Sequence, residues 1–244
     1  MNELYLSRIA LKRQEIPNFV EYPFSIPVIQ EFNEIELNSP VTFLIGENGI
    51  GKSTFMEAIA MAMGLNPEGG SQNFHFSTFD DYSQLYQYLQ VSKFGVPKTK
   101  FFLRAESFYN VASSIDRDYN DGMSAKLNES YGGSLHECSH GESFLQLVEN
   151  RFSDHGLYIL DEPEAALSPT RQMTLLCLID QLVKEGSQFI IATHSPILIS
   201  YIHGKILDLN RGFCETKLED TDIYQTYQDF LKNPYGMQKI LFEE

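Results

Sequence analysis

The chain of 244 residues is 43% hydrophobic, 21% charged and 13% aromatic. These values are typical of a globular protein and exclude disordered and fibrous classes. The net charge of −15 disfavours nucleic acid as a partner, because a phosphate backbone is held by clustered Lys and Arg. Three cysteines indicate a reducing compartment, which we take to be the cytoplasm. Residues 1–14 lack the apolar centre of a secretory signal, and all apolar runs are short. We therefore expect neither a leader nor a membrane association.

The N-terminal half predicts strands on either side of one helix. The first forty residues favour extended structure, because prolines punctuate short apolar segments. The apolar run Val41–Ile45 is typical of a buried strand in a parallel sheet, and residues 53–64 carry apolar side chains at helical spacing. A short helix is expected within 83–90 and a second buried strand over 100–105. Residues 116–133 are rich in Asp, Asn and Gly and predict a mobile surface segment.

The C-terminal half predicts a further alternation of helices and strands. A helix is expected from Ser139, followed by a buried strand over 157–160. Ser168 is a suitable N-cap for a helix that has Pro169 at its first position and ends near Gly186. Strands are expected over 189–193 and 205–209. This alternation predicts an α/β fold with a mainly parallel sheet flanked by helices.

A phosphate-binding loop is predicted where the first buried strand meets the first helix. Residues 46–54 read GENGIGKST and match G-x-x-x-x-G-K-[ST]. Glycines let successive backbone N–H groups turn inward around a phosphate, and the helix N-terminus adds positive charge. We expect Lys52 to contact the β- and γ-phosphates of ATP, and Ser53 to ligate Mg²⁺. The predicted nucleotide-binding residues of this loop are Gly46, Glu47, Asn48, Gly49, Ile50, Gly51, Lys52, Ser53 and Thr54.

Two acidic residues stand at the end of the strand predicted over 157–160. Asp161 is expected to hold Mg²⁺, as the strand-end Asp does in P-loop NTPases. Glu162, one residue further on, is expected to be the general base for an attacking water. Together with the loop, these residues predict a Mg·ATP site.

The order of these motifs resembles that of ATP-binding-cassette (ABC) ATPases. Residues 161–169, DEPEAALSP, resemble the strand-end D-E-P and D-loop of that family, and Ser139-His140-Gly141-Glu142 resembles its S-G-G-Q signature. His194 follows another strand, at the position of the family's switch histidine. The motifs run in family order from residue 46 to residue 196.

The resemblance implies one ABC-type ATPase domain over 1–244, with a helical signature lobe at about 107–150 and an antiparallel N-terminal β portion. It also implies a head-to-tail homodimer that encloses two ATP molecules. In such a dimer Ser139, Gly141 and Glu142 bind the nucleotide of the partner copy. His194 senses the γ-phosphate, and Lys52, Glu162 and His194 form the catalytic set.

The chain departs from the transporter pattern at several motif positions. His140 and Glu142 stand where transporters have Gly and Gln, and Ser168 stands at the D-loop Asp. No Q-loop Gln is evident, and Glu106 is its candidate replacement. With these departures, the sequence resembles the soluble branch of the family, which includes RecF and SMC proteins and small single-domain bacterial ATPases.

Three functions follow as hypotheses. The first is Mg-dependent ATP binding and hydrolysis that drives dimerisation and acts on an unidentified protein partner, in DNA maintenance or phage defence. The second is the ATP-binding subunit of a transporter. The third is an ATP-gated binding module with negligible turnover.

Other patterns carry weaker expectations. Residues 136–140 spell H-E-x-x-H, but the predicted helix start at Ser139 separates the two His, which disfavours a zinc site. Cys138 and Cys177 are expected to be small buried residues. The basic residues of the segment 93–104 are the candidate nucleic-acid patch, although a solvated loop is the favoured interpretation. They are Lys93, Lys98, Lys100 and Arg104.

Overall fold

The computed structural model describes residues 4–67, 69–71, 83–105 and 140–242. Its centre is a sheet in the order β10-β9-β3-β8-β7-β6-β4, in which the central strands are parallel. Antiparallel β4 and β10 lie at the two edges. The strands of this sheet are β3 (Val41–Ile45), β4 (Gly70–Ser71), β6 (Thr99–Arg104), β7 (Gly156–Asp161), β8 (Gln188–Ala192), β9 (Gly204–Asp208) and β10 (Cys214–Thr216).

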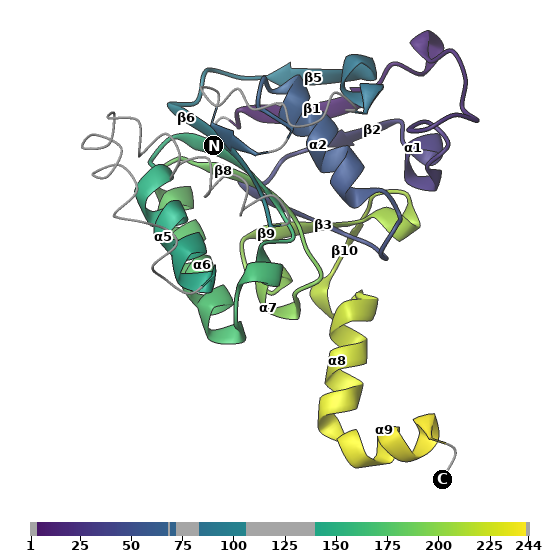
Figure 1. Ribbon diagram of the computed structural model, residues 1–244, viewed down its shortest axis with the longest axis vertical. Coiled ribbons are helices and arrows are strands. Elements are labelled where there is room, and N and C mark those ends of the chain that lie inside the picture. The colour runs from purple at the N-terminus through teal and green to yellow at the C-terminus, as the bar shows by residue number, and fades with distance from the viewer. Residues whose placement is uncertain (1–3, 68, 72–82, 106–139, 243–244) are drawn as a thin grey trace.

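A smaller antiparallel sheet covers one side of this layer together with helix α2 (Figure 1). It has the order β2-β1-β5, formed by β2 (Glu34–Glu36), β1 (Leu6–Leu11) and β5 (Leu89–Lys93). The predicted antiparallel N-terminal portion is therefore confirmed. Strand β5 was missed because its residues Leu-Gln-Val-Ser-Lys carry little apolar signal, and only the turn Gln84–Tyr88 before it is helical.

Helices cover the other face of the main sheet (Figure 1). The helices of the described chain are α1 (Pro27–Glu31), α2 (Lys52–Ala62), α5 (His140–Arg151), α6 (Pro169–Lys184), α7 (Pro196–Ile199), α8 (Asp222–Lys232) and α9 (Pro234–Leu241). Ser168 caps α6 as predicted, accepting a hydrogen bond from the N–H of Arg171. Among the described residues, no helix combines the length and apolarity needed to cross a membrane.

The core has two parts, one on each face of the main sheet. One part packs α2 and the small sheet against Leu44, Ile159 and Ile190, and the other packs α5 and α6 against Phe43 and Leu160. Strands β3, β7 and β8 are buried at every residue, which is why their sequences read as continuous apolar runs rather than alternating ones. The predicted α/β fold is confirmed.

A buried glutamine joins the small sheet to the main one. Gln188, at the start of β8, donates its side-chain N–H to the carbonyl of Leu6 (2.7 Å) and accepts the N–H of Leu6 (2.9 Å). Both residues are at most 1% exposed. These two bonds satisfy backbone groups of β1 that would otherwise be buried without partners.

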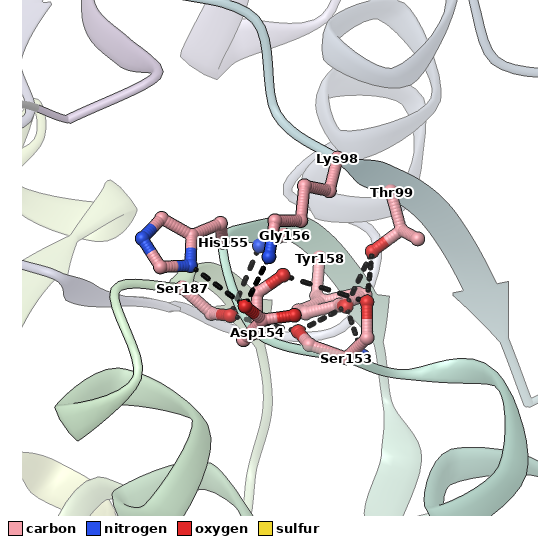
Figure 2. Close-up of polar contacts among 8 residues, drawn as sticks. All are labelled: Lys98, Thr99, Ser153, Asp154, His155, Gly156, Tyr158 and Ser187. Carbon is pink, nitrogen blue, oxygen red and sulfur yellow. Dashed lines mark hydrogen bonds and ion pairs between the residues drawn. The ribbon is translucent and has the colours of Figure 1, made fainter.

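A polar network fixes the start of β7, at the end of the sheet away from the predicted site (Figure 2). The Tyr158 hydroxyl accepts the N–H of Ser153 (2.6 Å) and donates to the carbonyl of Ser153 (2.8 Å). It also lies 2.7 Å from the Thr99 hydroxyl of β6. Ser187 donates to the same Ser153 carbonyl and accepts the N–H of Gly156. The turn between α5 and β7 is thereby held against β6 and β8.

Candidate nucleotide site

The predicted phosphate loop leaves the end of β3 and enters α2. Gly51 is the N-cap of α2 with φ +109°, a conformation that L side chains rarely adopt. A Cβ at this position would lie 2.5 Å from Ile26 Cγ2, so the close approach of α1 also requires glycine. The loop therefore depends on a contact with the preceding segment as well as on its own motif.

Lys52 lies inside the loop and is 4% exposed. Its ammonium donates to the carbonyls of Gly46 (2.8 Å) and Glu47 (2.9 Å). Burial lowers the pKa of Lys52, and the carboxylates of Glu162 and Asp161 oppose this shift. The usual lysine pKa is near 10.5, and the nearby carboxylates counter the effect of burial. Both facts favour the charged form of Lys52, which is the form that binds phosphate.

Residues of the β9 edge support the back of the loop. The Asn210 side chain accepts the N–H of Glu47 (3.1 Å), and Asp208 accepts the N–H of Asn210 (2.9 Å). A cavity of about 120 Å³ beside them is lined by Gly46, His194 and Asp222, among others. Asp208 and Asn210 were not predicted, because they follow no motif and lie more than 150 positions from the loop.

Asp161 lies at the end of β7, as predicted, and is 2% exposed. The Ser53 hydroxyl lies 3.4 Å from its Oδ1. Two oxygen ligands at this separation suit Mg²⁺, whose neighbouring octahedral ligands lie about 3 Å apart at metal–oxygen distances of about 2.1 Å. The donor chemistry of Ser53 and Asp161 therefore fits the expected ion.

Glu162 and His194 face each other across the ends of β7 and β8. Glu162 has the left-handed conformation (φ 51°), and its N–H donates to the carbonyl of Ala192. Its Oε1 lies 3.8 Å from Nε2 of His194. Burial lowers the pKa of His194, nearby Lys52 lowers it further, and Glu162 opposes both. The imidazole is therefore neutral at pH 7, when it can donate or accept a hydrogen bond.

Glu164 is a site residue to which the sequence assigned no role. Its carboxylate accepts the N–H of His194 and so fixes the backbone that carries the imidazole. Burial raises the pKa of Glu164, and the neighbouring Glu162 adds to this effect. Hydrogen bonds from the N–H of His194 and from the Thr193 side chain lower this pKa in part, but burial has the larger effect.

We expect Glu164→Gln to stabilise the protein by about 1 kcal/mol at pH 8, because burial disfavours the carboxylate charge and an amide carries no charge. Because the folded pKa of Glu164 is raised, the folded protein favours the protonated carboxyl. With respect to this group the protein is therefore most stable at low pH, and it loses stability as the pH rises through the folded pKa and the carboxyl becomes charged. The advantage of the variant should therefore shrink at pH 5. Urea unfolding at both pH values checks this result. The exposed Glu149→Gln is the control, and an equal gain for Glu164→Gln at both pH values would contradict the interpretation.

The predicted signature lies at the start of α5. Ser139 and most of the H-E-x-x-H segment lie outside the described residues. A Cβ on Gly141 would lie 2.9 Å from the carbonyl of Ala166, so α5 packs closely on the segment that resembles a D-loop. The Glu142 carboxylate pairs with the Arg171 guanidinium at 2.8 Å. Arg171 was not predicted, because its partner lies on a different helix.

The basic residues of 93–104 form neither a free patch nor the expected solvated loop, because Lys93 lies on β5 and Lys100 and Arg104 lie on β6. Each of the four side chains contacts a carbonyl or a carboxylate. The partners of Lys93, Lys98, Lys100 and Arg104 are, in that order, the carbonyl of Ala62, the carboxylate of Asp154, the carbonyl of Met63, and the carboxylates of Glu57 and Asp161. The two contacts to α2 carbonyls place positive charge at the helix C-terminus, where it is favourable.

One further expectation was wrong, and three others concern residues outside the described part of the chain. Cys177 is exposed, because it lies on the outer face of α6, so the expected burial was wrong. Cys138, Glu106 and the segment 116–133 lie outside the described residues, so the proposed replacement of the Q-loop Gln stays a prediction. Arg104 is the residue that lies beside Asp161 at the end of β6.

A glycine-rich loop between a strand and a helix, with Lys52 inside it and Asp161 on the neighbouring strand, defines the class of P-loop nucleotide-binding proteins. A family profile described as an AAA domain matches residues 15–150, and the chain belongs to this family. A second AAA-domain profile matches residues 142–200, with a suggested link to the AbiEii toxin of type IV toxin–antitoxin systems.

Similar proteins include ATP-binding subunits of importers. The cobalt import ATP-binding protein CbiO of Salmonella typhimurium is 28% identical over 202 residues, which cover 76% of this chain and 73% of that protein. An uncharacterized ABC transporter ATP-binding protein of Methanocaldococcus jannaschii is 25% identical over 94% of this chain and 87% of its own length. The SMC head domain from Thermotoga maritima aligns with a TM-score of 0.43 and 17% identity, covering 84% of this chain and 95% of that one. The predicted resemblance to ABC-type P-loop ATPases is confirmed, and the relatives include transporter subunits.

Proposed function

We propose that the protein binds Mg·ATP, closes as a homodimer around two nucleotides and hydrolyses ATP to ADP and phosphate. The observation that carries this proposal is the convergence of Lys52, Ser53, Asp161 and the Glu162–His194 pair at one edge of the sheet. Each of these groups has a chemical task in phosphoryl transfer to water. The site would work as one unit within a single domain.

In this proposal Lys52 and the loop N–H groups neutralise the phosphates. Ser53 and Asp161 hold Mg²⁺, which when bound withdraws charge from the phosphate oxygens. Glu162 accepts a proton from the attacking water, and neutral His194 donates a hydrogen bond to the γ-phosphate. The backbone at Ser139 and Gly141, with Glu142, contacts the nucleotide of the partner copy.

The dimer is tested by light scattering in Mg·ATP and in Mg·ADP, with phosphate release followed in the same samples. We expect Glu162→Gln to lower turnover about 10²–10⁴-fold, because it removes the general base, and to accumulate a dimer in Mg·ATP only. The exposed Glu149→Gln is the matched control, because it makes the same change of charge on α5. A monomeric Glu162→Gln at saturating ATP would rule out the enclosed-nucleotide mechanism.

A transporter subunit is the second candidate, supported by the names of the relatives. It requires a membrane partner, whereas the main proposal has the protein in the cytoplasm, where the exposed thiols Cys177 and Cys214 would stay reduced. Fractionation of cells that express the protein at its natural level distinguishes the two, because a transporter subunit sediments with membranes. Normal dimerisation without phosphate release would instead favour the ATP-gated binding module.

The dimer is also expected to act on a partner in the cell. We infer that closing and opening of the dimer acts on a protein partner in DNA maintenance or phage defence. Its support is limited to the resemblance to the RecF and SMC branch and the suggested toxin–antitoxin link of the profile on residues 142–200.

A further inference from the structure

Arg104 lies between two carboxylates at the proposed metal site. It ends β6 and is the register partner of Asp161 on β7. Its Nε lies 3.5 Å from Oδ2 of Asp161, and one of its terminal nitrogens lies 3.5 Å from Oε2 of Glu57 on α2. The side chains are 25%, 2% and 15% exposed for Arg104, Asp161 and Glu57, so this row of charges is largely shielded from water.

The chemistry of Arg104 sets it apart from a metal ligand. A guanidinium has five N–H donors and no acceptor, and it stays charged at every pH at which the protein folds. It cannot coordinate Mg²⁺, yet it attracts the carboxylate that the proposed function assigns to Mg²⁺. Ser53 lies beside Oδ1 of Asp161 and Arg104 beside Oδ2, so the two oxygens face different groups.

Glu57 gives the arginine a second anion. Its carboxylate also lies near the backbone N–H of Ser83, which favours the charged form and so lowers its pKa in part. It projects from α2 five residues beyond Lys52, on the side of the helix that faces the end of β6. The arginine can therefore shift its charge from Asp161 to Glu57 while the backbone stays in place.

We propose that Arg104 is a built-in counter-ion that occupies Asp161 before Mg·ATP binds and is retained by Glu57 when the metal takes over the carboxylate. This inference rests on the proposed function, because it assumes that Ser53 and Asp161 hold Mg²⁺. Arg104 is then a positioning residue that sets the metal affinity of the site and keeps Asp161 oriented in the absence of nucleotide.

The proposal predicts opposite effects from two neutralising variants. Arg104→Gln removes the cation that competes with the metal, so metal affinity in the presence of ATP should rise about tenfold. Glu57→Gln removes one of the two carboxylates that Arg104 contacts within the described chain, so Arg104 binds Asp161 more firmly and metal affinity should fall several-fold. The double variant should behave like Arg104→Gln, because Glu57 acts only through the arginine.

The test uses Mn²⁺ as a spectroscopic probe, titrated into the full-length protein with saturating ATP and displaced by Mg²⁺. Thermal unfolding in EDTA without nucleotide is the second readout. There Arg104→Gln should unfold at a lower temperature than the wild type, because the Asp161 carboxylate is left buried with one partner fewer. Opposite shifts in Mn²⁺ affinity for the two single variants support the proposal.

An unchanged or lower Mn²⁺ affinity in Arg104→Gln, or a higher one in Glu57→Gln, would overturn it. Should Arg104→Gln fail to fold, Glu57→Gln still decides, because it keeps the Arg104–Asp161 pair. Asp161→Asn separates this inference from the proposed function. If Asp161→Asn binds Mn²⁺ as the wild type does, the proposed metal site itself is wrong. If it loses Mn²⁺ while the other variants show no shift, only the role of Arg104 is wrong.

Discussion

Lys52→Met should weaken ATP binding by about 100-fold or more. The variant keeps the aliphatic stem but removes the ammonium, which donates hydrogen bonds to two loop carbonyls. Hydrogen bonds to charged groups contribute about 1.5–3 kcal/mol each, and two lost phosphate contacts therefore exceed the 2.7 kcal/mol that corresponds to 100-fold. Titration calorimetry with Mg·ATP measures the effect directly.

Lys100→Met is the matched control for this experiment. Lys100 also has a lowered pKa because of burial, and it also donates to a backbone carbonyl, that of Met63 at the other end of α2. Both variants lose an ammonium that donates to backbone carbonyls, but only Lys52 lies in the loop. We expect Lys100→Met to bind ATP within about threefold of the wild type, since it makes no phosphate contact. Equal losses in the two variants would mean that the loop is not the nucleotide site.

Gln188→Leu should have the largest effect on stability, lowering the free energy of unfolding by about 2–6 kcal/mol. Leucine fills similar space but leaves the N–H and the carbonyl of Leu6 buried without partners. Each buried backbone group that loses its partner costs about 1–3 kcal/mol. Urea unfolding measures the loss, and nucleotide binding by the folded fraction should be retained, because Gln188 begins β8 whereas the nucleotide site lies where the parallel strands end.

The control for that variant is Gln181→Leu on α6. The Gln181 side chain is exposed and, among the described residues, bonds to Glu185, so this change should alter stability by less than about 0.5 kcal/mol. A Gln188→Leu loss within the same range would show that the small sheet docks through its apolar residues alone.

The predictable parts of the fold are those whose local sequence pattern matches the burial that the segment has in the folded protein. Strands β3, β7 and β8 are buried on both faces, so their apolar runs are unbroken and end where the polar site begins. The phosphate loop and the α6 cap are fixed by residues within a few positions of one another. Strand β5 could not be predicted, because its polar residues form a strand only by pairing with β1.

The same distinction separates the predicted site residues from the missed ones. Lys52, Asp161 and Glu162 belong to short motifs that can be read in the sequence. Arg104 and Arg171 contribute through ion pairs with carboxylates on other helices and strands. The charges of these arginines are visible in the sequence, but their partners are not. Helices α8 and α9, which extend from the body in Figure 1, were missed for another reason. Neither helix has a buried residue among the described residues, although α8 carries Ile223, Tyr227 and Phe230 at helical spacing, so its pattern was present in the sequence but was not interpreted as a helix.

The position of β3 in the sheet has a consequence for synthesis of the protein on the ribosome. Strand β3 carries the phosphate loop, and its two neighbours are β8 and β9. The first of these emerges about 150 residues later, which at about 5–20 residues per second takes on the order of 10–30 s. During that interval the nascent chain holds a complete loop motif with no strand to pair against it. ATP can therefore act as a folding ligand only late, after more than three quarters of the chain has been made.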